Sequence, residues 1–377
     1  MRKTAIFGGS FDPPTNAHYA LGVQLSRRFD RVIVVPAYIS PFKKAGAELD
    51  GAQRIKLLRD IFAPFPNVEV SDCEIAAKGT SYSYMTAQRF KEEGTQLYFV
   101  IGSDGLGSLN KWARTDILKE TVEFYVVERP FFPVKEAELI AARKILNVTV
   151  APFKGEEGSS SLLKVAVAFG KEREVVPDTV ADYIEENALY RDYDYIVSAY
   201  PRFNLKKSRI DHVYRTAKAA ILLAKLNGAD TEKTIRAALL HDIAKYLTRE
   251  DLDKEGIEFT PQMQALPAPC VHQLTGAAVA KKVFNECDEV IAAIATHCTG
   301  GRNMTLLQKI VFAADYIEEG RDFDGLDRIR QAVYDDIDKG IKLIYENTIA
   351  FLRASGQEVA PATIDAYEYL KSDKEKT

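Results

Sequence analysis

The hydrophobic pattern of the chain changes near residue 191, and this change constrains the fold more than any other feature. Before it, short apolar runs at residues 4–7, 31–35, 97–101 and 122–127 alternate with stretches of helical periodicity. Such alternation predicts a parallel β-sheet covered by helices on both faces, with ligands at the carboxyl ends of the strands. After it, apolar residues recur at helical spacing throughout. The helical stretches are residues 210–226, 231–245, 275–284, 289–297, 306–319 and 329–352.

The length of 377 residues allows two domains of ordinary size, each with its own core. We expect an α/β domain over residues 1–191, a linker over residues 192–207 and an all-α domain over residues 208–377. This segment contains Pro201 and is the best candidate for a linker, although Tyr193, Tyr195 and Tyr200 indicate that it packs against a domain.

The charge balance and the cysteines limit the classes of function. The net charge is −4 with both signs mixed, so polymeric nucleic acid is an unexpected partner. No apolar stretch is long enough to span a bilayer, and the run after Met1 is too short for a signal peptide. Four cysteines without paired spacing favour a reducing compartment and predict a cytoplasmic protein. Cys270 and Cys298 lie near histidines, but we interpret them as small buried hydrophobic residues rather than ligands.

All five histidines fall into two groups, and the first group is His18 alone. It ends a segment that begins with Gly8 and Gly9 directly after the first apolar run. Two glycines after a strand let backbone N–H groups approach a phosphate, and a helix that starts near Asn16 offers its positive end to the same anion. An imidazole in that first turn can donate to phosphoryl oxygens in a transition state. The segment predicts a nucleotide-phosphate pocket.

The other four histidines lie in the second half together with two aspartates. This group consists of His212, His241, Asp242, His272, His297 and Asp315. Four imidazoles and two carboxylates can hold two divalent ions, with one carboxylate bridging them. Ions at such a site activate water for attack on phosphorus, and imidazole-rich sites suit iron, manganese or zinc. The residue pattern alone does not choose among these metals.

The segment from Gly8 to His18 resembles the signature of the nucleotidylyltransferase superfamily, Gly-Gly-(Ser/Thr)-Phe-Asp-Pro-x-(His/Thr)-x-Gly-His, with Thr15 as the permitted variant. Other segments resemble the nicotinate-nucleotide adenylyltransferase family. They are the basic loop Pro41-Phe42-Lys43 followed by Arg54, the pyridine-nucleotide segments 81–83 and 102–112, Arg129-Pro130, the closing serine-rich motif 158–164, and the C-terminal helix 176–190.

This resemblance implies adenylyl transfer from ATP to nicotinate mononucleotide, giving deamido-NAD and pyrophosphate with the help of Mg²⁺. It assigns catalytic roles to His18, Lys43 and Lys164. The implied ATP-binding residues are Gly8, Gly9, Ser10, Phe11, Thr15, His18, Ser160, Ser161 and Lys164. The implied nicotinate-nucleotide-binding residues are Ser81, Tyr82, Ser83, Asp104, Trp112 and Arg129.

Four positions depart from the usual family pattern. Thr15 is a variant, Ala17 replaces glycine, Phe42 stands where histidine is common, and Lys164 replaces an arginine. A lysine cannot make the bidentate contacts of an arginine. An alternative therefore stays open, in which the first domain is an impaired nucleotide-binding module that regulates or feeds the second.

The histidine group of the second half resembles the HD phosphohydrolase superfamily, with the six residues of the group as metal ligands. Segments 208–212, 237–245, 272–277, 295–300 and 314–318 narrow the resemblance to the YqeK-like group. This implies symmetrical hydrolysis of diadenosine tetraphosphate to two ADP, with Asp242 and Lys245 in catalysis and a preference for a di-iron centre. Lys245 and Arg321 would contact substrate phosphate, unless they are solvated helix-end charges. Another nucleotide phosphate ester stays open as the substrate, as does homo-oligomer formation.

Overall fold

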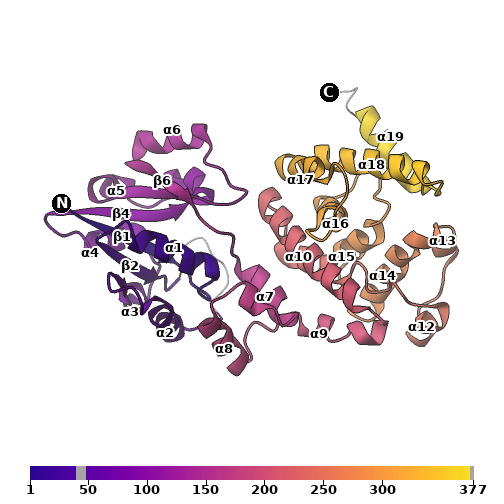
Figure 1. Ribbon diagram of the computed structural model, residues 1–377, viewed down its shortest axis with the longest axis horizontal. Helices are drawn as coiled ribbons and strands as arrows, with labels where there is room; N and C mark the ends of the chain where they lie inside the picture. The colour runs from indigo at the N-terminus through magenta and orange to yellow at the C-terminus, as the bar shows by residue number, and fades with distance from the viewer. Residues whose placement is uncertain (40–47, 374–377) are drawn as a thin grey trace. The chain divides into compact units, whose positions relative to one another are not determined.

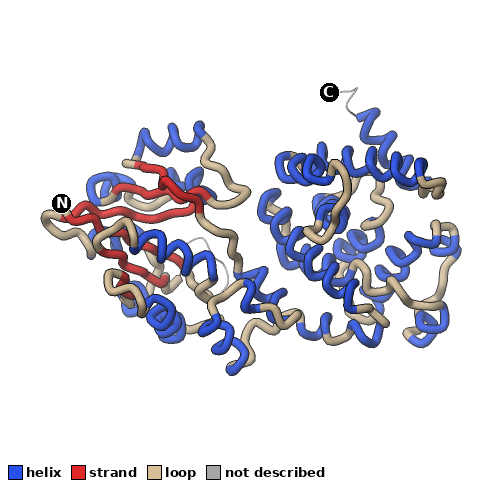
Figure 2. The backbone as a smooth tube through the Cα atoms, viewed as in Figure 1, coloured by secondary structure: helices blue, strands red, loops and turns tan. Residues whose placement is uncertain are grey.

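The computed structural model describes residues 1–39 and 48–373 and divides into two compact units, Met1–Arg191 and Asp192–Thr377. All strands of the described chain lie in the first unit, and the second is helical throughout (Figure 2). The predicted α/β domain followed by an all-α domain is confirmed. Among the described helices, none has the length and apolar character needed to cross a membrane.

The first unit is built on a six-stranded parallel sheet with the order β3-β2-β1-β4-β5-β6 (Figure 1). The strands are β1 (Arg2–Gly9), β2 (Arg31–Pro36), β3 (Val68–Val70), β4 (Thr95–Gly102), β5 (Glu123–Glu128) and β6 (Val148–Lys154). The chain starts at a central strand and builds outward first to one edge and then to the other. The strand order therefore reverses between β1 and β4, which is where doubly wound sheets bind ligands.

The four central strands are buried on both faces, which explains their continuous apolar sequences. On one face, Phe99 and Phe124 belong to a core that also includes residues of η1, α5 and α6. On the opposite face, Phe29 packs edge-on against Tyr98 and Tyr125, with ring centroids 5.1 and 5.3 Å away. The edge strands β3 and β6 are only partly buried, so they lack the apolar runs that revealed the other four.

The helical elements of the first unit alternate with the strands. They are α1 (Asn16–Ser26), α2 (Gly51–Phe62), α3 (Cys73–Ala77), α4 (Ser83–Arg89), η1 (Ser103–Lys111), α5 (Thr115–Thr121), α6 (Glu136–Ile145), α7 (Ser160–Ala168), η2 (Glu172–Glu174) and α8 (Asp178–Glu186). The segment after α8 returns to the start of the unit, because the hydroxyl of buried Tyr190 donates to Asp12 Oδ1 at 2.8 Å. The same Asp12 carboxylate accepts the backbone N–H groups of Glu48 and Leu49 at 2.9 and 3.0 Å.

The second unit begins within the segment that we expected to be a linker. Tyr193 and Tyr200 are buried there, and the Tyr200 hydroxyl donates to the carbonyl of Leu239 at 2.9 Å. The elements of this unit are α9 (Asp194–Val197), η3 (Tyr200–Phe203), α10 (Lys207–Asn227), α11 (Thr231–Leu240), α12 (Arg249–Lys254), α13 (Pro261–Gln264), η4 (Ala268–Cys270), α14 (Val271–Lys282), α15 (Asp288–Thr296), α16 (Leu306–Ile317), α17 (Leu326–Asp335), α18 (Ile337–Ala354) and α19 (Pro361–Asp373). Helices α10, α11, α15 and α16 pack on one another as its centre.

Two helical predictions for the second half were too long. The stretch 231–245 ends as a helix at Leu240, so His241 follows α11 instead of lying within it. The stretch 329–352 is broken at Asp336, whose side chain accepts the N–H groups of residues 338 and 339 and starts α18. Gly340 then lets α18 pack closely on α17, because a Cβ atom at this position would clash with Val333 Cγ2.

Candidate active sites

A cavity of about 350 Å³ lies in the first unit at the carboxyl ends of β1 and β4. It therefore opens at the reversal point of the strand order, where the sheet topology predicts a ligand. The residues of the predicted nucleotide site that line it are Gly8, Gly9, Ser10, Thr15, His18, Ser81, Ser83, Trp112 and Arg129. The structure brings these residues together from four separate parts of the chain.

His18 is held by the first turn of α1. The backbone N–H of Thr15 donates to His18 Nδ1 at 3.0 Å, and Thr15 Oγ1 accepts the His18 N–H at 3.4 Å and lies 2.8 Å from Nδ1. These contacts form a capping box. An N–H group can only donate, so Nδ1 is the acceptor and the imidazole proton lies on Nε2. The variant Thr15 thus orients His18 as a donor.

The second departure from the family pattern, Ala17, is accommodated by a glycine. A Cβ atom on Gly158 would lie 2.8 Å from Ala17 Cβ and 3.0 Å from Thr15 Oγ1. The segment before α7 therefore approaches the start of α1 closely, and both line the cavity. Arg129 joins them, because its Nη2 donates to the carbonyl of Gly158 at 3.2 Å and its Nη1 pairs with Asp104 at 3.0 Å.

Other predicted residues of the first site do not line the cavity within the described part of the chain. They are Phe11, Tyr82, Asp104, Ser160, Ser161 and Lys164. Phe11 is buried with its ring 4.9 Å from the His18 ring, so its role is packing. Ser160 and Ser161 form the first turn of α7, behind its N-cap Ser159. Lys43 and Phe42 lie outside the described residues.

Two buried nitrogen groups give further information on this site. Arg54 donates from Nη1 to the carbonyls of Ser10 and Ala37, each at 2.7 Å, and so holds the loop after β1. Trp112 lines the cavity and packs edge-on against Phe99 and Phe124, while its buried Nε1–H has no hydrogen-bond partner among the described residues. A buried donor at a cavity wall is available to an acceptor on a ligand.

The six predicted metal ligands of the second unit converge from five places in the helical bundle. His212 lies on α10, His272 in the first turn of α14 and Asp315 on α16, while His241 and His297 are the C-caps of α11 and α15. Asp242 follows His241. The four imidazoles and Asp242 are buried.

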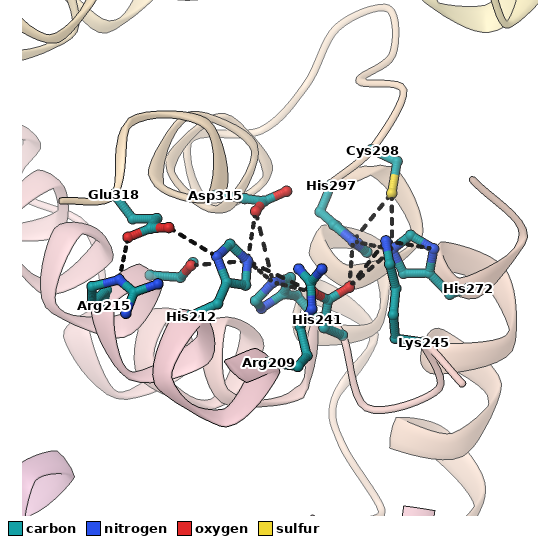
Figure 3. Close-up of polar contacts among 12 residues, drawn as sticks. Arg209, His212, Arg215, His241, Lys245, His272, His297, Cys298, Asp315 and Glu318 are labelled. Atoms are coloured by element: carbon teal, nitrogen blue, oxygen red, sulfur yellow. Dashed lines mark hydrogen bonds and ion pairs between the residues drawn. The ribbon is translucent and has the colours of Figure 1, made fainter. Parts of the chain in front are cut away.

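The distances divide the cluster into two ends that share Asp242. At one end, His212 Nε2 lies 2.9 Å from Asp315 Oδ1, 3.4 Å from His241 Nε2 and 3.7 Å from Asp242 Oδ2. At the other end, His272 Nε2 lies 3.0 Å from His297 Nε2 and 2.9 Å from Asp242 Oδ1. Figure 3 shows the two groups side by side. A carboxylate between two groups of imidazoles can bridge two ions.

Three of the imidazoles have their second nitrogen fixed by an oxygen. His241 Nδ1 donates to the carbonyl of Ala238 and His297 Nδ1 to that of Ile294, each at 2.7 Å. His212 Nδ1 lies 3.1 Å from Glu318 Oε1. In each case Nε2 is left to face the cluster, which is the arrangement of histidines that bind metal ions.

The carboxylate of Asp242 also fits a bound cation. Its Oδ2 accepts from Arg209 Nη1 at 2.7 Å, whereas its buried Oδ1 has no hydrogen-bond partner within the described chain. Burial raises the pKa of Asp242, but the facing imidazoles, His241 first, outweigh it and hold that pKa well below its usual range. An ionised, buried oxygen without a hydrogen bond is costly unless a cation approaches it. The donor set therefore suits divalent ions.

Protonation of the imidazoles differs along the cluster. Burial lowers the pKa of His241, and it lowers the pKa of His272 to about 4 in spite of the nearby Asp242. For His212, burial acts in the same direction, but Asp315 and Glu318 outweigh it and raise the pKa. The lone pairs of His241 and His272 are therefore available to a metal ion at neutral pH.

The predicted phosphate-contacting residues both lie at the cluster. Lys245 Nζ is 3.1 Å from His272 Nε2 and 3.8 Å from Asp242 Oδ1. Arg321 Nη2 is 3.0 Å from Asp315 Oδ1, and its side chain is 41% exposed. Lys245 thus lies directly beside two of the predicted metal ligands, whereas Arg321 lies at the edge of the site.

Several residues around the ligands have contacts that the sequence did not predict. Glu318 is buried between His212 and Arg215, whose Nε donates to Glu318 Oε2 at 2.6 Å. Cys298 Sγ lies 3.2 Å from Nε2 of both His272 and His297. Our interpretation of this cysteine as an inert hydrophobic residue does not describe these contacts. Glu318 lies in segment 314–318 of the resemblance and three residues after the predicted ligand Asp315, but its contact with His212 was not predicted.

Comparisons with known proteins match the two units of the chain separately. A cytidylyltransferase-like family model matches residues 6–164 and an HD domain model matches residues 209–320. A probable nicotinate-nucleotide adenylyltransferase of Clostridium botulinum is 32% identical over 200 residues, which cover 51% of this chain and 100% of that protein. A symmetrical bis(5'-nucleosyl)-tetraphosphatase of Halalkalibacterium halodurans is 39% identical over 176 residues, which cover 44% of this chain and 91% of that protein.

Some relatives have both parts in a single chain. A probable nicotinate-nucleotide adenylyltransferase/Ap4A hydrolase of Mycoplasma pneumoniae is 27% identical over 368 residues, 93% of this chain and 98% of that protein. The HD match implies divalent metal binding, and the histidine–aspartate cluster supplies the donors for it. The chain thus belongs to the nicotinate-nucleotide adenylyltransferase family through its first unit and to the HD-domain symmetrical bis(5'-nucleosyl)-tetraphosphatase family through its second.

Proposed function

We propose that this protein is a bifunctional enzyme. The first unit transfers the adenylyl group of ATP to nicotinate mononucleotide, giving deamido-NAD and pyrophosphate. The second hydrolyses diadenosine tetraphosphate symmetrically to two ADP. The observation that carries the first activity is His18, oriented as a donor at the cavity beside Gly8 and Gly9. The observation that carries the second is the buried cluster of four imidazoles around Asp242.

In the first unit, the reaction needs two polyanions held in line and no protein nucleophile. The N–H groups after β1 and the positive end of α1 attract the phosphates of ATP. The Nε2–H of His18 donates to a phosphoryl oxygen as negative charge develops. Lys43 and Lys164 neutralise the leaving pyrophosphate, and Mg²⁺ screens the charges when it is bound. The wall formed by Ser81, Ser83, Trp112 and Arg129 holds the nicotinate nucleotide.

In the second unit, His212, His241, Asp242, His272, His297 and Asp315 hold two divalent ions, with iron favoured and manganese or zinc as alternatives. Bound there, the ions supply a water of lowered pKa and neutralise phosphoryl oxygens. Arg209 holds Asp242 in place through its 2.7 Å contact. Lys245 and Arg321 place their positive charges where the polyphosphate chain binds. A symmetrical cut follows when the central linkage of that chain lies over the cluster.

The hydrolase activity is tested with the full-length chain, purified without oxygen and supplied with diadenosine tetraphosphate and Fe²⁺ or Mn²⁺. We expect ADP as the only product, and we expect its formation to be lost in His241→Ala and Asp242→Ala. His18→Ala is the matched control, because it should leave ADP formation unchanged. Formation of AMP and ATP would contradict the symmetrical cut, and no cleavage would indicate another phosphate ester as the substrate.

The transferase activity is tested on the same preparation by pyrophosphate release from ATP and nicotinate mononucleotide. We expect His18→Ala to reduce the rate by about 10²–10⁴-fold, the usual contribution of a positioned proton-donating side chain, while Asp242→Ala leaves it intact. Nucleotide binding without pyrophosphate release in the wild type would support the alternative of an impaired nucleotide-binding module. Each activity therefore serves as the folding control for variants of the other.

A further inference from the structure

We propose that Cys298 is a thiolate ligand at one end of the metal cluster. Together with His272, His297 and Asp242 it makes this end a nitrogen–sulfur site that prefers zinc-like ions over manganese or magnesium. The inference deepens the proposed hydrolase function, since it concerns the same cluster, but it assigns a residue and a metal preference that the function does not require.

The geometry of the three donor atoms is that of a metal-binding face. Cys298 Sγ lies 3.2 Å from His272 Nε2 and 3.2 Å from His297 Nε2, and the two nitrogens are 3.0 Å apart. A tetrahedral zinc ion with Zn–N of about 2.0–2.1 Å and Zn–S of about 2.3 Å spaces its ligands about 3.3 Å for N–N and about 3.5 Å for N–S. An expansion of a few tenths of an ångström converts the observed triangle into that face.

The fourth ligand comes from Asp242. Its buried Oδ1, which lacks a hydrogen-bond partner among the described residues, lies 2.9 Å from His272 Nε2 and 3.8 Å from His297 Nε2. A tetrahedral site would space nitrogen and oxygen about 3.3 Å apart, so Oδ1 would move about half an ångström away from His272 and toward His297 to bind the ion. An acceptor with no hydrogen-bond partner among the described residues, next to two imidazoles, indicates a missing cation independently of the cysteine.

The opposite end of the cluster has a different donor set. There His212, His241 and Asp315 offer two nitrogens and an oxygen, and the described contacts include no sulfur. Thiolate ligands select zinc and other soft or borderline ions, whereas carboxylate-rich sites accept manganese and magnesium. The two ends of the centre therefore differ in metal preference, although they share Asp242.

Two neighbours compete with this assignment and must be tested with it. Lys245 Nζ lies 3.1 Å from His272 Nε2, so its ammonium group can take the place of a metal ion there. Cys270 interacts with Cys298 through its side chain, so it is the other thiol that could reach the ion. Figure 3 shows Lys245 and Cys298 approaching the His272–His297 pair from the surrounding loops and helices.

The test uses Co²⁺, whose absorption spectrum reports thiolate ligation directly. The full-length chain, freed of metal under reducing conditions, is titrated with Co²⁺ and followed by absorption, with bound cobalt counted by equilibrium dialysis. We expect thiolate-to-cobalt charge-transfer absorption in the near ultraviolet and the intense visible bands of a tetrahedral ion. Cys298→Ser should lose the charge-transfer absorption. It should also lower the affinity for Zn²⁺ at least about tenfold, because mutation of a residue that only supports a metal ligand already lowers metal affinity by about 10–100-fold.

Controls identify the thiol that binds. Cys287→Ser removes an exposed cysteine and should leave the spectrum unchanged, as should Cys270→Ser. Loss of the band in Cys270→Ser with its retention in Cys298→Ser would overturn the assignment. Cobalt binding by the wild type without any thiolate band would also overturn it and leave the hydrolase centre standing. No cobalt binding at all, including in Lys245→Met where the competing ammonium is absent, would overturn both this inference and the metal site of the proposed function.

Discussion

Replacing Glu318 by glutamine tests how strongly the residues behind the ligands control metal binding. Three histidines of the cluster are oriented through Nδ1, two of them by backbone carbonyls that mutation cannot remove. His212 is oriented by the Glu318 side chain, which is 2% exposed. Glu318 therefore offers the one such contact, among those described, that a side-chain substitution can change.

The expected loss of metal affinity depends on the hydrogen bonds that the Glu318 carboxylate accepts. Its Oε1 faces His212 Nδ1 at 3.1 Å, and its Oε2 accepts from Arg215 Nε at 2.6 Å and from the Gly320 N–H at 2.5 Å. Burial raises the pKa of Glu318, but His212 and Arg215 outweigh it and lower that pKa to about 2. A glutamine amide has one acceptor oxygen, so in either orientation its NH₂ group faces a donor.

Loss of a supporting partner behind a metal ligand costs about 10–100-fold in metal affinity, or about 1.4–2.7 kcal/mol at 1.36 kcal/mol per tenfold. We expect Glu318→Gln to fall near the upper limit, because the substitution places a donor against a donor in a buried site. The assay is calorimetric titration of the metal-free protein with Mn²⁺. Glu319→Gln is the control, since Glu319 is 60% exposed and pairs with Lys218 at the surface. Equal affinity of Glu318→Gln and wild type would refute this reasoning.

Two further predictions concern the first unit. Gly158→Ala should raise the KM for ATP in the pyrophosphate-release assay, because the added Cβ would meet Ala17 at 2.8 Å, whereas Gly105→Ala, with nothing within 4 Å of its Cβ, should not. An unchanged KM in both would contradict the close approach at the cavity. Tyr190→Phe should lower the free energy of unfolding by about 1–3 kcal/mol, measured by urea denaturation, because it removes the hydrogen bond to Asp12. A stability equal to wild type would show that this contact does not hold the end of the unit to its start.

Much of the fold could be predicted because buried strands and helix faces have apolar residues at characteristic spacings. Strands covered on both faces read as continuous apolar runs, and four such runs correspond to β1, β2, β4 and β5. The edge strand β6 could not be found in this way, since residues such as Pro152 and Lys154 are exposed and interrupt the apolar pattern. The break at Asp336 was also hidden, because apolar spacing continues through it, and the capping contacts of the Asp336 side chain become evident only in the structure.

The residues of the metal cluster could be predicted from the sequence, but the contacts that orient them could not. Histidines and aspartates are rare enough in apolar helices that their presence indicates ligands. The residues that orient them are less conspicuous. Glu318 and Arg215 are ordinary charged residues in a chain that has many, and they meet only because α10 and α16 pack together. Likewise, nothing in the spacing of Cys298 shows that its sulfur faces two imidazoles.

The two sites use opposite helix ends to select opposite tautomers of histidine. A helix N-terminus has unpaired N–H groups, and a C-terminus has unpaired carbonyls. His18 lies at the start of α1 and accepts a backbone N–H on Nδ1, so its proton lies on Nε2, where it can donate to a phosphate. His241 and His297 end α11 and α15 and donate from Nδ1 to the carbonyl three residues earlier, so Nε2 carries a lone pair.

For His18, His241 and His297, the polarity of the helix end thus determines whether the imidazole faces its site as a donor or as an acceptor. A donor suits an anionic phosphate and an acceptor suits a cation, so the same side chain serves adenylyl transfer in one unit and metal binding in the other. Moving a histidine by a few residues along its helix would keep it near the site but remove this control. The position of these three histidines at helix ends is therefore as much a part of the chemistry as the choice of residue.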